Sequence, residues 1–529
     1  MKSHRTPPRF EPRRTGNAFI VATMLLSLCI LSLIKARYCS VPNGVCVCVF
    51  FFSLSLSLRQ IGVWSTKSSC KICKNKLLSS RMNYAHILQN ICPFIWSILL
   101  LLIQMIIDQM LCFFFAEDEE DEGNTITSQK IVAEKAAIDL SKPICSETSK
   151  RSNVCEADGD IRLLGSSHTI LLHPSSTDRE WKTKPYCRKH DPPAMKNIKE
   201  WTIKPFPISE PPPQCTVNYT VPALVFSIGG FTGNLFHDFT DVIVPLFISS
   251  YQFRGEVQFV VADIKPWWVS KFILILKQLS NYDIIDANND DQEAVRCFPR
   301  VIVGLSFHKE LGVDPSKTPT GYSIVDFKAM LRKAYGLERP TAAPSGDPWD
   351  IRRKPRMLII SRKKTRAFLN ERGMTDMAMS LGFDVRVAEP DITTDLAKFA
   401  RLVNSADVMI GVHGAGLTNM VFLPEGAVLI QVVPMGGLDW LARDTFGQPS
   451  PDMQIKYMDY RIQADESTLS DQYPADHPVL KDPYSIHKQG WNALSKTYLD
   501  NQNVRPHLGR LRNTLMDALK HLPHGRKEA

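Results

Sequence analysis

An apolar segment that runs directly into a glycine-rich turn constrains the fold of this chain most strongly. Residues 407–412 are mainly apolar, and His413-Gly414-Ala415-Gly416 follows them before a short helical segment begins. A near-continuous apolar run is typical of a buried parallel strand, and glycine lets the backbone approach a ligand closely. The amino end of the next helix would present free N–H groups to an anion. The segment therefore predicts an α/β fold with a site for an anion such as a diphosphate.

The chain around this segment alternates apolar strands with helical segments. Strands are expected at 221–228, 257–263, 283–286, 300–305, 357–361, 384–388, 407–412 and 427–433, and helices at 235–253, 267–279, 324–335, 375–381, 396–405 and 417–422. This alternation predicts two Rossmann-like α/β domains with parallel sheets, at 216–338 and 356–486. A proline-rich linker at 339–355 joins them, and 487–529 is expected to be a C-terminal helical segment. Ligands of such folds bind at the carboxyl ends of the strands, here in a cleft between the domains.

The amino terminus carries a membrane-targeting pattern. Basic residues, among them Arg13 and Arg14, precede an apolar run at 18–34. The length of the run is at the lower edge for a membrane span, and the flanking charge favours a cytoplasmic amino terminus. A cleaved signal peptide is the alternative, but no small-x-small site follows promptly. We interpret 1–37 as a cytoplasmic tail and type II membrane anchor.

Residues 38–115 are atypical for a protein segment. They contain Phe, Ser and Leu runs and a second long apolar stretch at 94–115. This stretch is long enough to form a second membrane span, yet such composition is also what a translated pyrimidine-rich intron yields. We hypothesise a retained intron here. The following acidic and polar residues favour a solvated stem, so 116–215 is interpreted as a stem and a disulfide-bearing lead-in.

The remaining composition indicates a lumenal location and excludes some partners. Of 13 cysteines, Cys145 and Cys155 close a short loop suited to a disulfide in an oxidising compartment. Asn218 begins an N-glycosylation sequon. The net charge of +9 is concentrated in basic groups without interleaved aromatic residues, so we expect no nucleic-acid partner. Asp158-Gly159-Asp160 is interpreted as a surface turn, and no metal site is expected.

Two strand-to-helix corners carry candidate catalytic chemistry. Arg362 and Arg366 follow the strand at 357–361, where guanidinium groups would bind phosphate oxygens. His237 and Asp241 are four residues apart, so on a helix they share one face. Transfer of a group from a diphosphate needs a general base and positive charge for the departing diphosphate. Either His237 or Asp241 could be that base, and a packed core histidine is the alternative for His237.

Three motifs in this order resemble glycosyltransferase family 61, in particular the plant branch that decorates xylan. The resemblance covers roughly 142–521. The residues that carry it are Asn234, His237, Phe239 and Asp241, then Ser361, Arg362 and Arg366, then the segment 411–419 with Leu423 and Pro424, with further agreement at Met458, Tyr460, 466–469, Asp482 and Pro483.

The resemblance implies a GT-B fold and an inverting reaction that needs no metal or other cofactor. The implied donor site comprises Arg362, Arg366, His413, Gly414, Ala415, Gly416, Leu417, Thr418 and Asn419, with His237 and Asp241 catalytic and Asn234 and Glu466 supporting. The expected reaction moves an arabinofuranosyl or xylosyl unit from a UDP-sugar onto xylan in the plant Golgi, with the catalytic part lumenal. An N-glycan core xylosyltransferase, a protein O-GlcNAc-type transferase and a catalytically silent glycan-binding scaffold are the alternatives.

Overall fold

The computed structural model describes residues 144–173, 179–206, 209–288, 294–342 and 354–522. The expected anchor at 1–37, the insert at 38–115, the first part of the stem and most of the linker lie outside these ranges. Within them, no helix has both the length and the apolar character needed to cross a bilayer. The described residues belong to one compact unit, which contains two sheets, each with its own helices.

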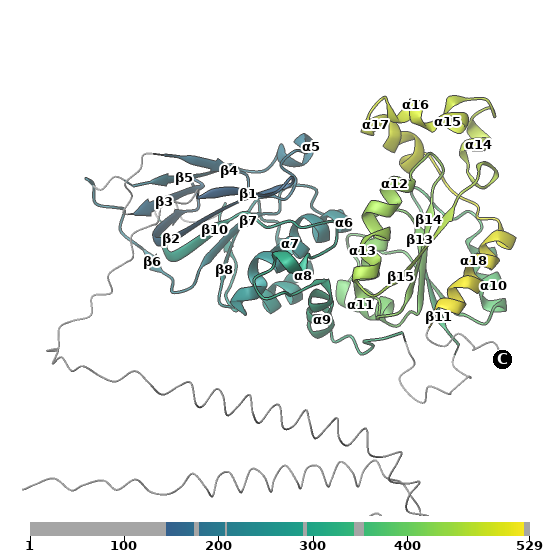
Figure 1. Cartoon of the computed structure of the whole chain (residues 1–529), viewed down its shortest axis with the longest axis horizontal. Coiled ribbons are helices and arrows are strands. Elements are labelled where there is room, and N and C mark those ends of the chain that lie inside the picture. The colour runs from purple at the N-terminus through teal and green to yellow at the C-terminus, as the bar shows by residue number, and fades with distance from the viewer. Residues whose placement is uncertain (1–143, 174–178, 207–208, 289–293, 343–353, 523–529) are drawn as a thin grey trace, which may run out of the picture. The chain divides into compact units, whose positions relative to one another are not determined.

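The first lobe extends from β1 to α9 and is built on a mixed sheet (Figure 1). The path through the sheet is β4-β5-β3-β2-β10-β7-β8-β9, with β1 paired to β2 and β6 to β10. Its strands are β1 Cys145–Ser149, β2 Ser152–Leu164, β3 Thr169–His173, β4 Trp181–Thr183, β5 Trp201–Pro205, β6 Val217–Asn218, β7 Ala223–Ser227, β8 Gln258–Ala262, β9 Ile285–Asp286 and β10 Arg296–Val303. Strands β10, β7, β8 and β9 run parallel, whereas β2 is antiparallel to both β3 and β10.

This arrangement corrects two sequence expectations. Residues 145–205 were expected to be a lead-in, but they form β1 to β5 of the first sheet, which is therefore mixed rather than parallel. Asp158 and Asp160 lie within β2 and not in a turn. The physical reason is that β2 alternates buried and exposed residues, so its charged positions gave it the polar composition of a solvated segment.

The helices of the first lobe cover one face of its parallel strands. They are α5 Pro192–Met195, α6 Leu235–His237, η1 Asp238–Ile243, α7 Val244–Ser250, η2 Tyr251–Phe253, α8 Pro266–Leu279, η3 Pro315–Lys317 and α9 Ile324–Tyr335. The single helix expected at 235–253 is thus a succession of short α, π and 3₁₀ segments. Helix α9 begins at a capping box of Ser323 and Asp326 and ends at Gly336, whose left-handed φ of 59° is favourable for glycine.

The second lobe extends from β11 to α18 and contains a wholly parallel sheet of order β12-β11-β13-β14-β15 (Figure 1). Its strands are β11 Arg356–Ile360, β12 Asp384–Ala388, β13 Val408–Val412, β14 Val428–Val433 and β15 Lys456–Arg461. Strands β13 and β14 are buried along their whole length, in agreement with their continuous apolar sequence. The parallel α/β arrangement expected for this half is confirmed.

Helices pack on both faces of the second sheet. They are α10 Glu371–Ser380, α11 Leu396–Asn404, η4 Ala415–Phe422, α12 Asp439–Ala442, η5 Arg443–Gly447, α13 Pro449–Asp452, η6 Ala464–Glu466, α14 Leu469–Gln472, α15 Pro478–Lys481, α16 Pro483–His487, α17 Trp491–Leu494, η7 Ser495–Asp500 and α18 Leu508–His521. Helices α10 and α18 share a core with one face, and α11 and η4 pack on the other (Figure 1). The core beneath α11 and η4 is continuous with the helical side of the first lobe.

Candidate active site

A carboxylate at the centre of the first lobe collects several donors. Asp241 lies in η1, and its side chain has no exposed surface. Its Oδ2 accepts hydrogen bonds from the Tyr186 hydroxyl at 3.0 Å and from Arg188 Nε at 2.7 Å. The Arg151 guanidinium lies 3.9 Å from Oδ1. Burial acts to lower the pKa of Arg188, but the Asp241 carboxylate outweighs it and holds that pKa above its ordinary value. The charge of Asp241 is therefore compensated by cations of its own lobe.

His237 is the member of this group that solvent can reach. Its side chain is 18% exposed, and Nδ1 lies 2.9 Å from Asp241 Oδ2. Because the carboxylate accepts the Nδ1 proton, Nε2 is left with its lone pair and can act as a base. The ring packs against Phe231 at a centroid distance of 4.6 Å and against Phe236 at 5.4 Å, which fixes its plane. The sequence left His237 and Asp241 as equal candidates, and burial of Asp241 favours His237 as the group that meets a substrate.

An irregular helix creates this arrangement. Asn234 caps α6 by accepting a hydrogen bond from the Phe236 backbone N–H at 3.1 Å. The chain then widens into the π-helix η1, a form that often occurs at functional sites. The sequence spacing correctly predicted that His237 and Asp241 would meet, although they do so across an α-to-π junction. Asn234 therefore shapes the corner without touching either side chain.

A second corner lies at the carboxyl ends of β11 and β13 and gathers positive charge. Gly414 has a φ of 147°, and a Cβ built on it would come within 2.7 Å of Arg362 Nη1 and 3.0 Å of Arg366 Nη1. Arg362 is held by the Thr365 carbonyl oxygen at 2.9 Å, and Arg366 donates to the His413 carbonyl oxygen at 2.9 Å. Burial lowers the pKa of both, that of Arg366 to about 10 with a further contribution from Arg362. Two desolvated guanidinium groups over one glycine have the charge and geometry that suit an anion.

His413 is buried beside these cations in a fixed tautomer. The side-chain amide of Gln431 lies 2.6 Å from His413 Nδ1, and the Tyr457 hydroxyl donates to Gln431 Oε1 at 2.8 Å. The Gln431 oxygen is thus committed, so its amide nitrogen donates to Nδ1 and Nε2 carries the proton of the neutral ring. Burial, with Arg366 and Arg362 adding to it, lowers the pKa of His413 to about 3. His413 therefore remains a neutral hydrogen-bond donor at physiological pH.

The turn after His413 divides into an accessible part and a core part. Ala415 and Gly416 are partly exposed at the amino end of η4, where the first N–H groups of a helix lack intrahelical acceptors. Leu417 belongs to the main core, and Thr418 and Asn419 are also buried. The Asn419 amide donates to the Gly416 carbonyl oxygen at 2.9 Å. These last three residues support the turn, and its backbone faces outward.

Aromatic contacts bring the two corners together. Phe446, in the π-helix η5, lies 5.8 Å from the Phe236 ring and 5.8 Å from the His413 ring, both measured between centroids. Phe236 is the residue before His237. The chain of rings from His237 through Phe236 and Phe446 to His413 therefore joins the corner of the first lobe to the corner of the second. Sequence reasoning did not identify Phe446.

Three further polar residues lie at this site, and sequence reasoning missed two of them, Tyr186 and Arg188. Tyr186 and Arg188 precede Asp241 by more than 50 positions, as their separations of 55 and 53 show, and no local pattern marks them. Asp238 is buried, accepts hydrogen bonds from Trp268 Nε1 at 2.9 Å and from the Gly233 N–H at 3.1 Å, and leaves Oδ2 unpartnered. Burial raises the pKa of Asp238 to about 6.

The other predicted residues make their polar contacts outside the two corners. Glu466 is buried and accepts hydrogen bonds from the backbone N–H groups of Gln463 at 2.8 Å and His507 at 2.6 Å, and it pairs with Arg510 of α18. Asn218 is exposed on β6, as a glycosylated residue must be.

Two disulfides lie in the first lobe. The one expected between Cys145 and Cys155 is present. A second joins Cys215 to Cys297 and had not been predicted.

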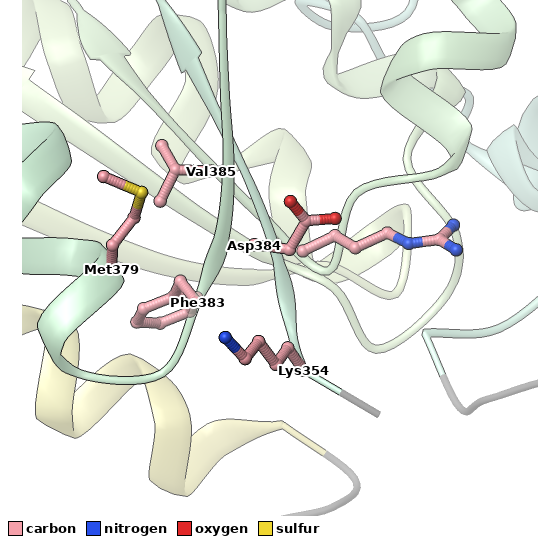
Figure 2. A pocket seen from close by; sticks show the side chains of 6 residues that line it. Lys354, Met379, Phe383, Asp384 and Val385 are labelled. Atoms are coloured by element: carbon pink, nitrogen blue, oxygen red, sulfur yellow. The ribbon is translucent and has the colours of Figure 1, made fainter. Parts of the chain in front are cut away.

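A cavity of about 360 Å³ in the second lobe is unrelated to these corners. It lies at the amino ends of β11 and β12, opposite the strand ends that carry Arg362 and His413. Figure 2 shows Met379, Phe383 and Val385 on one side of the strand and Asp384 on the other, with Lys354 nearby. Ligands of open α/β folds bind at the carboxyl ends of strands, so this cavity is not a candidate for catalysis.

Comparison with known proteins assigns the chain to a family. The model described as Glycosyltransferase 61 matches residues 182–430, which include both corners. The beta-1,2-xylosyltransferase XYXT1 of Oryza sativa subsp. japonica is 42% identical over 71% of this chain and 83% of its own length. The xylan glycosyltransferase MUCI21 of Arabidopsis thaliana is 39% identical over 75% of this chain and 83% of its own. This chain belongs to glycosyltransferase family 61.

A further relative is the alpha-1,3-arabinosyltransferase XAT3 of Oryza sativa subsp. japonica, 47% identical over 72% of this chain. The match spans 66% of the length of XAT3, slightly under two thirds. Among solved structures, that of the bacterial iron-containing dodecameric glycosyltransferase TibC from enterotoxigenic E. coli aligns with 55% of this chain and 81% of its own at 13% identity. Its TM-score of 0.21 is too low to inform the fold.

Proposed function

We propose that this protein is an inverting glycosyltransferase that moves a pentosyl unit, arabinofuranosyl or xylosyl, from a UDP-sugar onto xylan. The observation that carries the proposal is the adjacency of a buried His–Asp pair and a two-arginine corner, joined through Phe446. Membership of glycosyltransferase family 61 supports the reaction class, and the relatives named for arabinosyl and xylosyl transfer support the pentose. Another relative, MUCI21, is named for action on xylan.

His237 is the proposed general base. Its Nε2 takes the proton of the acceptor hydroxyl while that oxygen attacks C1 of the donor sugar and the bond from C1 to the diphosphate oxygen breaks. UDP leaves with the bonding electrons, so the configuration at C1 inverts. Asp241 is fully buried and cannot reach the acceptor. Its proposed role is to hold the His237 tautomer and to stabilise the imidazolium that forms.

The second corner is the proposed donor site. Arg362 and Arg366 would bind the diphosphate as its charge grows, together with the N–H groups at the start of η4 and the Nε2–H of His413. These fixed cations would supply the positive charge that a metal provides in other enzymes, and we propose that transfer needs no metal. Activity that survives extensive chelation would support this, and a strict requirement for an added divalent ion would contradict it.

We also propose a GT-B arrangement, with the second lobe binding the donor, and a type II anchor that places the described residues in the Golgi lumen. The wholly parallel second sheet and its carboxyl-end corner support the donor assignment. Two disulfides support a lumenal location, since oxidising compartments preserve them. Fractionation of the tagged full chain with Golgi markers tests the location, and a soluble cytosolic pool would contradict it.

Incubation with a panel of UDP-sugars and xylo-oligosaccharides tests the reaction. We expect transfer from UDP-arabinofuranose or UDP-xylose, with linkage analysis reporting an inverted configuration. Transfer of xylose to an N-glycan core, or of N-acetylglucosamine to a protein acceptor, would show that the acceptor is that molecule and not xylan. A chain that binds glycans and turns over none of the donors would be a scaffold, which contradicts the proposal.

Replacement of Arg362 by alanine tests the donor corner. Because its guanidinium lies over Gly414 and is desolvated, we expect Arg362→Ala to weaken UDP binding about tenfold to a hundredfold, the loss typical of a charge-assisted hydrogen bond. Calorimetric titration with UDP measures the affinity. Lys363→Ala is the matched control, since Lys363 is exposed and pairs with Glu389 at 2.8 Å. Equal UDP affinity in the wild type and Arg362→Ala would remove Arg362 from the donor site.

A further inference from the structure

A cavity between the two lobes lies next to the proposed reacting centre. Its volume is about 400 Å³, within the range of ligand pockets. The polar part of its lining comes from Arg151, Lys309 and Glu310 of the first lobe and from Asp444, Gln448 and Asp452 of the second. Such a space, lined from both lobes, is the kind of place where a two-lobed enzyme meets a second substrate.

Direct contacts connect this cavity with the His237 pair. Glu310 accepts a hydrogen bond from Thr240 Oγ1 at 2.7 Å and pairs with Arg151 at 2.5 Å. Thr240 is the neighbour of Asp241 in η1, and Arg151 also lies 3.9 Å from Asp241 Oδ1. On the other wall, Asp444 belongs to the same π-helix as Phe446, which contacts Phe236 and His413. One wall is thus anchored beside the proposed base, and the other beside the donor corner.

The charges of the lining favour a neutral, hydroxyl-bearing ligand over an anion. Both cations already have carboxylate partners: Arg151 pairs with Glu310, and Lys309 with Asp452 at 2.7 Å. Three carboxylates and two cations line the space, and Asp444 pairs with Arg443 at 3.2 Å, so a diphosphate would find no uncompensated cation among these lining residues. Carboxylate and amide oxygens accept hydrogen bonds from sugar hydroxyls. This polarity is the opposite of that at Arg362 and Arg366.

We propose that this cavity is the acceptor subsite and holds a neutral sugar unit of the acceptor glycan beside His237. The inference rests on the proposed function and adds the position and chemistry of acceptor binding. Asp444 and Gln448 are the specificity-determining side chains, since both are accessible and Gln448 Nε2 already donates to Asp444 Oδ1 at 3.1 Å. A sugar hydroxyl would share or replace that hydrogen bond.

Steady-state kinetics of the full chain with a xylo-oligosaccharide acceptor and the active UDP-sugar tests the subsite. We expect Asp444→Asn to raise the KM for the acceptor about tenfold, as loss of a charged hydrogen-bond acceptor predicts, while the KM for the donor stays within about twofold. Gln448→Trp fills the cavity and should abolish acceptor saturation. Asp439→Asn is the matched control, because Asp439 pairs with Arg461 at 2.9 Å outside the cavity, and it should leave both constants unchanged.

Saturation-transfer NMR with xylohexaose and UDP measures acceptor binding without turnover, so the subsite and the reaction can fail separately. Binding that Asp444→Asn and Gln448→Trp leave at the wild-type level would overturn the subsite. A raised donor KM with an unchanged acceptor KM would also overturn it, because the cavity would then belong to the donor. If the wild type binds xylohexaose but transfers no sugar, and both variants lose this binding, the result would uphold the subsite and contradict the proposed reaction.

Discussion

At the scale of single residues, burial separates the roles of two side chains that the sequence could only pair. Asp241 has no exposed surface and is compensated by Arg188, whereas His237 is 18% exposed. A buried carboxylate with fixed partners cannot change partners during turnover, and a half-buried imidazole can accept a proton. In the proposed mechanism the pair therefore acts through His237, and Asp241 holds the imidazole from the buried side.

We expect substitutions of His237 and of Asp241 both to lower the activity of the protein, but to differ in their effect on its stability. We expect His237→Ala to lower kcat by roughly a hundredfold or more, through loss of the base, with little change in the free energy of unfolding. Asp241→Asn should lower kcat as well and also destabilise the fold by about 3 kcal/mol, because Arg188 would remain buried without its carboxylate. Kinetics and denaturant unfolding of both variants measure the difference. Wild-type turnover in His237→Ala would end its assignment as the base.

His413 should make stability fall in mild acid. Its pKa is about 3 in the folded protein and 6.5 as the ordinary value. The unfolded chain therefore binds a proton before the folded one does, and this contribution to stability is complete above pH 6.5 and declines towards pH 3. From about pH 7 to about pH 5 the decline should be about 2 kcal/mol. Denaturant unfolding of the wild type and of His413→Asn at both pH values measures this decline in the free energy of unfolding. The variant should lack the part of the decline that His413 contributes. Equal pH dependence in both proteins would contradict a buried neutral His413.

At the scale of helices and strands, the sequence predicted those elements whose burial is uniform. Strands β13 and β14 are buried throughout, so their apolar runs were sufficient evidence. Strand β2 alternates between buried and exposed residues and carries Asp158 and Asp160, so its composition resembled that of a solvated stem. The pairing of His237 in α6 with Asp241 in η1 was predictable because the two residues are near in sequence. The partners Tyr186 and Arg188 were not, because only the fold brings such distant residues together.

Glu466 should be essential for docking the last helix. It accepts hydrogen bonds from the Gln463 and His507 N–H groups and pairs with Arg510 of α18. Although burial acts to raise its pKa, these hydrogen bonds hold the pKa of Glu466 below its ordinary value. Glu466→Gln should cost about 2 kcal/mol of unfolding free energy, measured by denaturant titration. Asp471→Asn, at an exposed pair with Arg505, is the control and should leave the transition midpoint unchanged. A comparable loss in both variants would argue against a special role of Glu466.

At the scale of the whole molecule, the two sheets depend on one another. One apolar core contains strand residues of both sheets together with residues of α8, α9, α11 and η4. Polar contacts reinforce it: buried Lys328 of α9 donates to the Met453 carbonyl oxygen at 2.7 Å, and Arg332 of α9 pairs with Glu425 at 3.2 Å. The two domains that the sequence suggested thus share their interior. A core shared in this way would hold the His237 corner and the Arg362 corner in one fixed relation.

A shared core predicts that both lobes unfold together. Thermal unfolding of the full chain should show one transition for residues 144–522, with the same midpoint in far-ultraviolet circular dichroism and in tryptophan fluorescence. Saturating UDP, which we propose binds the second lobe, should raise that single midpoint for both probes, since ligand binding stabilises whatever unfolds with the site. Trp268 of α8 lies in the first lobe and is fully buried, so a chain that retains only this tryptophan reports on the first lobe alone. A midpoint for Trp268 that UDP does not move would show that the lobes unfold separately and that the core does not couple them.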